Sequence, residues 1–507
     1  MSFARVYSAQ VNMLAGQIIG VEVDTARGLN AFSVVGLPDK AVEEARDRVG
    51  STLKNSDFDS PKHSQTKTIV SLTPAETKKE GAFFDLGIAI GFLLATEQVF
   101  FNADDKVFIG ELSLAGELKK VRGTLPITQK ARHENFLEIF VPEANAIEAA
   151  LVAGITVYPV KNINQLVLHL SGILLIKAQD PTIFENVIKN NRADLSDIRG
   201  QESAKRGLEI AAAGGHNICM YGPPGTGKTM LARAFANLLP QLTLDEALEV
   251  TGIHSIVGAN DTLENFLISN PPFRSPHHTA SYVAIVGGGA NVKPGEATLA
   301  HRGVLFLDEF PEFDRKVIEA LRQPLEDNYV SISRARGSAQ FPSNFILVAA
   351  MNPCPCGNKG SKKKQCRCGP NDIARYEKKI SGPIMDRIDL WVSVAEIDYA
   401  TLGKSRDGEN SNEVSIRIQN ARQIQRARFN DNKKNSDMNV RDLEKYAYIK
   451  PEIRKTLDTS AERLQLSPRA YHRVIKLART IADLENSQDI TENHILEALQ
   501  YRPKVTY

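Results

Sequence analysis

The sequence predicts an α/β protein in which a parallel sheet covered by helices follows an amino-terminal α+β domain and precedes a helical carboxyl-terminal part. Residues 217–221 form a short apolar strand that leads directly into a glycine-rich turn. Residues 303–307 and 345–351 are apolar runs without alternation, which is typical of strands buried on both faces. Because strands and helical stretches alternate from residue 197 onward, we expect a parallel sheet.

Periodicity and composition divide the 507 residues into four segments. Residues 1–172 alternate strand patterns with helices, whereas residues 173–195 are polar and aperiodic and are expected to be a linker. Residues 196–400 contain the parallel-sheet pattern, and residues 401–507 are expected to form a helical lid. Within the third segment apolar residues recur at helical spacing between 317 and 325, but Pro324 weakens the last turn of that helix.

Composition is that of an ordinary globular protein, with 42% apolar and 24% charged residues. The longest apolar stretch, residues 86–95, is far shorter than the roughly 20 residues that a bilayer requires. The first residues lack the layout of a signal peptide. We therefore expect a cytoplasmic protein with no membrane partner. The net charge of +2 neither requires nor excludes nucleic acid, so a DNA-binding surface must come from local basic clusters.

The glycine-rich turn matches the phosphate-binding pattern G-x-x-x-x-G-K-[ST] between a strand and a helix. Successive backbone N–H groups of such a loop bind phosphate oxygens, and the helix N-terminus adds a positive dipole end. A lysine at this point neutralises the β- and γ-phosphates, and the next hydroxyl reaches Mg²⁺. The predicted ATP-binding residues are Gly222, Pro223, Pro224, Gly225, Thr226, Gly227, Lys228 and Thr229.

Polar residues that follow the other apolar strands complete the predicted catalytic site. Asp308 is expected to hold Mg²⁺ with Thr229, and Glu309 to orient and deprotonate the attacking water. Asn352 follows the next strand and is the candidate water-positioning residue. Phosphoryl transfer also needs cations, for which Arg387 and Arg469 are candidates. Taken alone, an arginine is more often a surface ion-pair partner than a catalytic group.

Four of the five cysteines lie together, as Cys354-Pro-Cys356 and Cys366-Arg-Cys368. Four thiolates suit a tetrahedral zinc ion, although the C-x-C spacing is tighter than the usual C-x₂-C. We predict a zinc site that closes a basic loop able to touch DNA; the alternative is reduced structural cysteines. Cys219 lies in an apolar strand and is expected to be part of the core.

Three strings give the chain a resemblance to the AAA+ branch that holds the magnesium-chelatase ATPase subunit and the MCM helicases. These are residues 222–229, 293–310 and 325–336. Over the whole length the chain resembles the ComM/YifB family. The markers of that family are Val35-Gly-Leu-Pro-Asp39, Phe273-Arg-Ser-Pro-His-His278 and Asn352-Pro-Cys-Pro-Cys-Gly357.

The resemblance implies a homohexameric ring with ATP at its subunit interfaces, where Arg387 and Arg469 would act on the neighbouring subunit's nucleotide. It also implies a helicase that drives branch migration of recombination intermediates during natural transformation. Its partners would be branched, single-stranded and double-stranded DNA and recombination proteins. Arg334 and Arg336 fall at the tip of a hairpin that in this branch points into the pore, so they are candidate DNA contacts; a solvated turn is the alternative. Residues 281–293 are a second candidate pore loop, or a plain flexible connection.

The amino-terminal region resembles the ribosomal S5-like fold of the Lon protease domain. In Lon the nucleophile lies in Lys-Asp-Gly-Pro-Ser-Ala-Gly, and the matching stretch here, residues 79–85, places Phe83 at the serine position. The Lon lysine follows Gly-Gly-Leu, whereas here Arg122-Gly-Thr precedes Leu125. Because a phenyl ring cannot attack a carbonyl, we expect no Ser–Lys dyad and no protease activity. A DNA-binding or ring-forming scaffold is the expected role.

Two rival functions fit the same ATPase core. One is the motor subunit of a metal chelatase, which leaves the Lon-like domain and the four cysteines unexplained. The other is a non-catalytic scaffold or a protein-remodelling chaperone of the MoxR type. Intact Lys228, Asp308 and Glu309 argue against an inactive ATPase.

Overall fold

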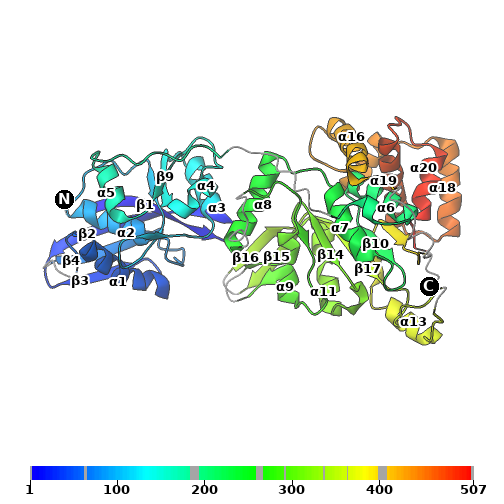
Figure 1. Ribbon diagram of the computed structural model, residues 1–507, viewed down its shortest axis with the longest axis horizontal. Coiled ribbons are helices and arrows are strands. Elements are labelled where there is room, and N and C mark those ends of the chain that lie inside the picture. Colours follow the sequence, from blue (N-terminus) through cyan, green and yellow to red (C-terminus); the bar gives the residue numbers. More distant parts are fainter. Residues whose placement is uncertain are drawn as a thin grey trace. The chain divides into compact units, whose positions relative to one another are not determined.

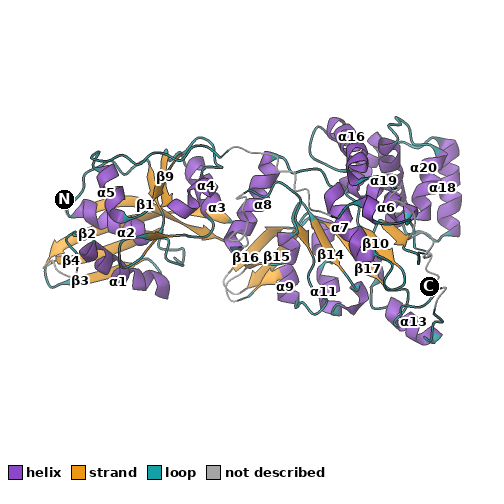
Figure 2. Ribbon diagram, in the orientation of Figure 1, coloured by secondary structure: helices purple, strands orange, loops and turns teal. Residues whose placement is uncertain are grey.

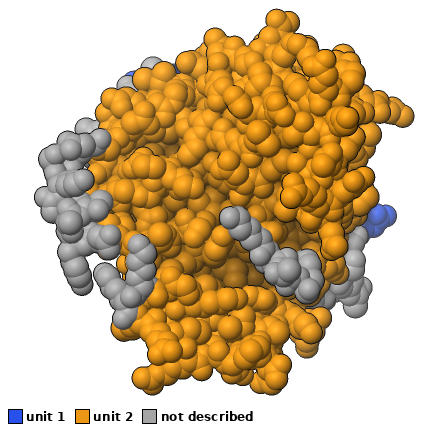
Figure 3. Space-filling view, turned by 90° about the vertical axis from the view of Figure 1, so that its right-hand side faces the viewer, with its two compact units in different colours: residues 1–186, 244–268 blue, residues 187–243, 269–507 orange. Residues whose placement is uncertain are grey.

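The chain divides into two compact units, unit 1 (residues 1–186 and 244–268) and unit 2 (residues 187–243 and 269–507), which Figure 3 colours separately. The structure is a computed structural model that describes residues 3–61, 66–182, 193–258, 267–289, 293–334, 337–361, 364–397 and 408–503. Its α/β architecture, with a parallel sheet and a helical carboxyl-terminal part, confirms the predicted fold class. The segment boundaries stay predictions. Among the described residues no helix is both long and apolar enough to cross a membrane.

Unit 1 is built on a seven-stranded mixed sheet with the order β3-β4-β2-β1-β5-β8-β9 (Figure 2). Neighbouring residues along β5 and just beyond it enter different apolar clusters: Val107 and Ile109 join one, and Phe108 joins the other. Because strand side chains alternate between faces, a core lies on each side of the sheet. The strands are β1 (Phe3–Asn12), β2 (Ala15–Arg27), β3 (Ala31–Val35), β4 (Thr66–Thr73), β5 (Lys106–Phe108), β8 (Glu138–Pro142) and β9 (Thr156–Val160), with a small ribbon of β6 (Glu111–Leu112) and β7 (Leu118–Lys119).

The helices of unit 1 include one from far along the chain. The five that come from residues 1–186 are α1 (Lys40–Asn55), α2 (Asp85–Ala95), α3 (Thr124–His133), α4 (Ala146–Ala149) and α5 (Ile163–Leu170). The sixth, α8 (Leu244–Val257), packs against α3. Its Ser255 hydroxyl accepts a hydrogen bond from Gly123 N at 3.0 Å and donates to the buried Glu148 carboxylate. Burial raises the pKa of Glu148, and hydrogen bonds from Ser255 and Leu125 N partly offset that effect.

Unit 2 contains a five-stranded parallel sheet with the order β11-β14-β17-β10-β18 (Figure 1). All residues of β14 and β17 are buried, as their uninterrupted apolar sequences predict. The strands are β10 (Ile218–Tyr221), β11 (Phe273–Arg274), β14 (Val304–Leu307), β17 (Ile346–Met351) and β18 (Leu390–Ser393); two ribbons are formed by β12 (Gly287–Gly288) with β13 (Lys293–Pro294) and by β15 (Tyr329–Arg334) with β16 (Gly337–Pro342).

Two sets of helices complete unit 2. The first set accompanies the sheet and consists of α6 (Glu202–Gly214), α7 (Lys228–Leu238), α9 (Tyr282–Val286), α10 (Glu296–Leu299), α11 (Arg315–Ala320), α12 (Arg322–Asp327), α13 (Pro370–Glu377) and α14 (Gly382–Met385). The predicted helix around Pro324 is in fact two short helices, α11 and α12, that meet at Leu321. Pro324 lies in the first turn of α12, where its missing N–H costs least.

The second set is the predicted helical lid. It consists of α16 (Ser411–Phe429), α17 (Val440–Tyr446), α18 (Pro451–Arg463), α19 (Pro468–Leu484) and α20 (Glu492–Gln500). α16 and α19 pack on α6 and extend the apolar core of the sheet. Side chains of α16 also satisfy the last carbonyls of α6: Arg422 Nη2 donates to Ala212 O at 2.8 Å and Gln425 Nε2 to Ala213 O at 3.0 Å. These bonds fix the lid against the sheet layer.

Candidate functional site

The predicted phosphate loop joins β10 to α7 at the carboxyl edge of the unit 2 sheet. β10 and β14 each pair in parallel with β17, so the residues that follow these three strands meet at one edge. α7 begins at Lys228 directly after Gly227, whose φ of +91° is open to glycine but strained for other residues. The loop, the start of a helix and the ends of two further strands are therefore brought together, as the sequence predicts.

Lys228 is folded back over its own loop. Its Nζ donates to Gly222 O at 2.7 Å, to Pro223 O at 2.9 Å and to Asn352 Oδ1 at 3.3 Å. Burial lowers the pKa of Lys228, while Asp308 nearby acts in the opposite direction. The predicted water-positioning residue, Asn352, thus lies within reach of the lysine that is predicted to bind the γ-phosphate.

The two predicted Mg²⁺ ligands are in direct contact. Thr229 Oγ1 donates to Asp308 Oδ2 at 2.8 Å, and the Asp308 Oδ1 atom accepts from Glu309 N at 2.9 Å. A hydroxyl and a carboxylate side by side offer the hard oxygen atoms that Mg²⁺ prefers. The residues present therefore fit a magnesium ion at this point.

Glu309 has a partner that the sequence analysis did not assign to the site. His278 Nδ1 lies 3.2 Å from Glu309 Oε2, and Glu309 itself has a φ of +51°. β11 pairs in parallel with β14, so residues after β11 reach the same edge as Asp308 and Glu309. In the sequence, the string 273–278 is a marker of the family and not of the site. The position of His278 shortly after a strand is the feature that could have placed it beside Glu309.

Arg387 and Arg469 lie at the opposite, amino edge of the sheet. Asn217, just before β10, donates from Nδ2 to Arg387 O at 3.0 Å. Arg387 also pairs with Glu326, whose other carboxylate oxygen lies 3.5 Å from Arg469 Nη2. The structure therefore brings the two predicted arginines together, and it places them away from Lys228 of their own chain.

A cavity of about 490 Å³ lies between these arginines. Two further basic residues, Arg473 and Lys476, line it and were missed by the sequence analysis. Arg473 pairs with Asp389. Burial alone would raise the pKa of the Asp389 carboxyl, but Arg473 and His216 beside it lower that pKa instead. No motif marks Arg473 or Lys476, because they reach the cavity from α19 through tertiary packing.

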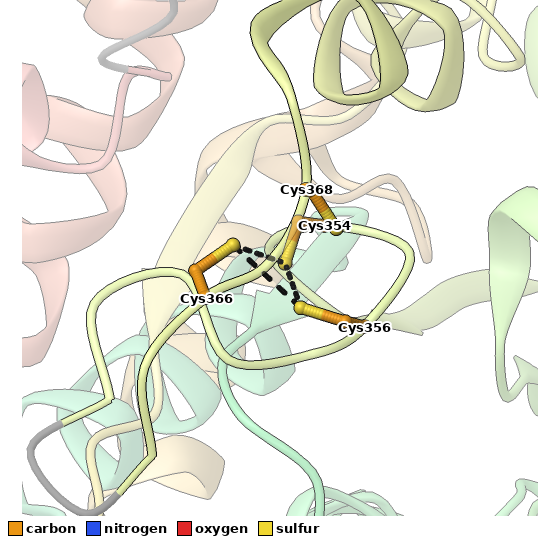
Figure 4. Close-up of side chains that lie close together, drawn as sticks. All are labelled: Cys354, Cys356, Cys366 and Cys368. Carbon is orange, nitrogen blue, oxygen red and sulfur yellow. Dashed lines mark hydrogen bonds between the residues drawn. The ribbon is translucent and has the colours of Figure 1, made fainter.

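The four clustered cysteines converge on one point, as Figure 4 shows. Their sulfur atoms all lie within 4.8 Å of one another, with Sγ–Sγ separations of 3.4, 3.6 and 3.7 Å among three of them. Four thiolates about 2.3 Å from a tetrahedral zinc ion would lie roughly 3.8 Å apart, so the set fits zinc. Backbone N–H groups of Arg367 and Asn358 lower the pKa of Cys356 to about 6. The fifth cysteine, Cys219, is buried in β10.

The candidate DNA contacts are only partly covered. Arg334 is the last residue of β15 and pairs with Gly337 across the hairpin, whereas Arg336 lies outside the described residues. In the second candidate loop, α9 carries the exposed side chains of Tyr282 and Val283, and residues 290–292 are not described. In unit 1, Phe83 packs against an apolar cluster of the core.

Comparison with known proteins identifies the relatives of the chain. Family models for magnesium chelatase subunit ChlI match residues 21–145 and 194–402, and the model for its C-terminal part matches residues 408–502. Competence protein ComM of Haemophilus influenzae is 42% identical over 510 residues, covering 100% of this chain and 98% of that protein. Protein YifB of Escherichia coli is 41% identical, covering 96% of this chain and 94% of its own length.

A more distant match is DNA replication licensing factor Mcm6 of Anopheles gambiae, 22% identical over 63% of this chain and 38% of that protein. The full-length matches confirm the resemblance drawn from the sequence, and the AAA+ ATPase fold implies ATP and Mg²⁺ as ligands. The chain belongs to the ComM/YifB family of magnesium-chelatase-like AAA+ ATPases.

Proposed function

We propose that the chain is the subunit of an ATP-driven homohexameric DNA motor, a helicase that promotes branch migration of recombination intermediates during natural transformation. The observation that carries this proposal is the division of the predicted catalytic residues between two edges of one sheet. Lys228, Asp308 and Glu309 lie at the carboxyl edge, and Arg387 lies at the amino edge with Arg469. Because one chain cannot bring both edges to one phosphate, hydrolysis requires a second copy.

At the carboxyl edge each residue has a chemical role. Lys228 and the N–H groups of the loop bind the phosphates, and Thr229 and Asp308 hold Mg²⁺, which neutralises phosphate charge. Glu309 accepts a proton from the attacking water while Asn352 orients that water. In the structure Lys228 is bonded to two loop carbonyls and to Asn352, so phosphate binding exchanges those contacts for stronger charge-assisted ones.

At the amino edge the arginines are arranged for a partner's anion. Arg387 is nearly buried, its Nε has no hydrogen-bond partner among the described residues, and Arg469 is 63% exposed beside it. We assign both to the γ-phosphate of a neighbouring subunit, where developing charge is stabilised. A closed ring repeats this head-to-tail contact at every interface.

The motor would act on branched, single-stranded and double-stranded DNA, with Arg334 and Arg336 as the predicted contacts to backbone phosphates. Two cations that contact phosphates make affinity dependent on salt, because phosphate contacts release counterions. The amino-terminal unit would serve as a scaffold without protease activity. The likeness to a competence protein over the full length supports natural transformation as the setting.

We assign zinc to Cys354, Cys356, Cys366 and Cys368. The ion would close residues 354–368 into a loop that backs onto the phosphate loop. The two loops approach so closely that a Cβ atom on Gly357 would lie 2.8 Å from Pro224 Cδ. Lys359 N also donates to Cys354 Sγ at 3.3 Å, a contact that suits a metal-bound thiolate.

A junction-unwinding assay with wild type and Glu309→Gln tests the proposal. We expect wild type to branch-migrate a four-way junction with ATP, and DNA to stimulate its ATP turnover. Glu309→Gln should bind ATP but hydrolyse it about 10² to 10⁴ times more slowly, because the general base is lost. Glu312→Gln, a nearby carboxylate that pairs with Lys379, is the control and should stay active. Near-normal turnover by Glu309→Gln would place the base elsewhere.

A second candidate is an ATPase that remodels a protein partner, either as the motor of a metal chelatase or as a MoxR-like chaperone. The family model for magnesium chelatase subunit ChlI favours it, since that model matches residues 194–402 and so covers the ATPase core. ATP turnover that no DNA structure stimulates, in a preparation where Glu309→Gln is inactive, would favour this second candidate.

A further inference from the structure

Glu326 pairs with Arg387 and Arg469, the two arginines that the proposed function assigns to the γ-phosphate of a neighbouring subunit. Arg387 Nη2 donates to Glu326 Oε2, and Arg469 Nη2 lies 3.5 Å from Glu326 Oε1. The hydrogen bond from Arg387 lowers the pKa of the Glu326 carboxyl, so the carboxylate is ionised at neutral pH. In an isolated subunit Glu326 therefore gives both guanidinium groups an internal anionic partner, while Arg387 Nε has no hydrogen-bond partner among the described residues.

The helix that carries Glu326 also holds the β15–β16 hairpin. One turn before Glu326 on α12, Gln323 accepts a hydrogen bond from Ser331 N at 3.2 Å and donates to Ser331 Oγ at 3.3 Å. Ser331 lies in the middle of β15, directly opposite Gln340 of β16.

A second attachment joins the end of α12 to the far strand of the hairpin. Asn328, which terminates the helix with a φ of +61°, accepts a hydrogen bond at its carbonyl from Ser343 N at 2.8 Å. Ser343 directly follows β16. α12 is only six residues long, so Glu326 lies within one turn of both attachments.

A γ-phosphate that reaches the arginines would compete with Glu326 for their N–H groups. A γ-phosphate carries more charge than one carboxylate and can bind guanidinium groups through two parallel hydrogen bonds. Arg387 also lies almost wholly inside the protein, with its side chain 9% exposed, whereas the Glu326 side chain is 51% exposed. The carboxylate is therefore the partner that is free to leave when phosphate arrives.

We propose that Glu326 is a positioning residue that couples the nucleotide bound at a neighbouring subunit to the position of the β15–β16 hairpin. This inference rests on the proposed function, because it takes Arg387 and Arg469 as the receptors of the neighbour's γ-phosphate. When the phosphate engages the arginines, Glu326 is released and α12 moves together with Ser331 and the strands of the hairpin. Coupling between binding sites is reciprocal, so DNA that displaces the hairpin alters the availability of the arginines by the same factor.

The test compares DNA affinity in two nucleotide states of the full-length protein. Fluorescence anisotropy with a labelled four-way junction gives the Kd with ADP and with a non-hydrolysable ATP analogue. We expect the two Kd values of wild type to differ by about fivefold or more. Glu326→Gln keeps the shape of the side chain but loses its charge, and the ratio of its Kd values should fall to about one. Asp327→Asn, the same change one residue along α12 at an exposed carboxylate, should keep the wild-type ratio.

A second variant separates coupling from folding. Gln323→Ala removes the two hydrogen bonds between α12 and Ser331 and keeps the contacts of Glu326 with the arginines. It should therefore also reduce the ratio of the two Kd values, while ATP turnover without DNA stays at the wild-type value. Melting temperatures are measured for every variant. A wild-type ratio in Glu326→Gln, or a ratio of one in wild type, overturns the coupling even where turnover and junction unwinding support the motor. Loss of DNA binding or of ATP turnover in wild type would instead refute the proposed function.

Discussion

The two edges of the unit 2 sheet differ in how their functional residues reach them. At the carboxyl edge the groups follow directly from strand ends: the loop after β10, Asp308 and Glu309 after β14, and Asn352 after β17. At the amino edge Glu326 comes from α12, Arg387 from the turn after α14, and Arg469 from α19. The residues of the carboxyl edge can therefore be recognised in short stretches of sequence, whereas those of the amino edge are brought together only by tertiary packing.

The difference also separates two kinds of chemistry. The carboxyl edge offers N–H groups, one ammonium group and oxygen ligands, which together suit a triphosphate and its metal ion. The amino edge offers guanidinium groups that pair with an internal carboxylate, Glu326. The first edge is complete within one subunit, and the second awaits an anion from outside. Removing a group from either edge should therefore have different consequences in mixed assemblies.

The largest expected effect comes from Arg387→Ala. Loss of an arginine that stabilises the transition state should lower kcat by roughly 10³ to 10⁵. Because the arginine is proposed to act on the neighbouring subunit, mixing Arg387→Ala with Lys228→Ala subunits should restore part of the ATP turnover. Some interfaces would then combine an intact loop with an intact arginine. The measurement is steady-state phosphate release at a series of mixing ratios.

Two controls accompany that experiment. Arg463→Ala removes an exposed arginine from the end of α18 and should keep full turnover. Lys228→Ala alone should be inactive, since the phosphates lose their ammonium partner. If mixing never restores turnover while both variants assemble with each other, Arg387 does not act across an interface, and the contrast between the two edges fails.

Sequence alone predicted the carboxyl edge well, because each of its strands is a distinctive apolar run that ends in polar residues. It could not predict Glu326 as the partner of Arg387, since the two are 61 positions apart and nothing in the string 325–336 specifies that contact. The packing of α8 in unit 1 was also beyond prediction. Its contacts with α3 depend on Ser255 meeting Gly123, and no local pattern distinguishes that helix from one covering the parallel sheet.

An intermediate effect is expected at the cysteine loop, which extends the carboxyl edge beyond Asn352. Cys356→Ser replaces a thiolate by a poor zinc ligand and should lower the bound zinc from one ion per chain to well below one. A loss of about 2 kcal/mol would lower the Tm by roughly 4–8 °C. Metal analysis and thermal unfolding measure the two quantities.

The loop's contact with Pro224 gives that prediction a functional readout as well. Because Gly357 backs onto the phosphate loop, we expect the KM for ATP to rise when zinc is lost. Lys364→Ala, which removes an exposed lysine of the same loop, should leave zinc content, Tm and KM unchanged. Full Tm and normal KM in zinc-free protein would show that the four cysteines are merely reduced structural residues.

The smallest effect is expected from His278, which tests whether the carboxyl edge needs a residue beyond those that the motifs name. The imidazole lies 3.2 Å from Glu309 and restrains its side chain, which is 55% exposed. His278→Ala should lower kcat by about tenfold to a hundredfold with the KM for ATP unchanged, because a misplaced base affects chemistry more than binding. His278→Asn retains a hydrogen-bond donor and should recover much of that loss. Equal rates in wild type and His278→Ala would show that the contact with Glu309 is only a surface pairing. The motif residues would then be sufficient for the chemistry at the carboxyl edge.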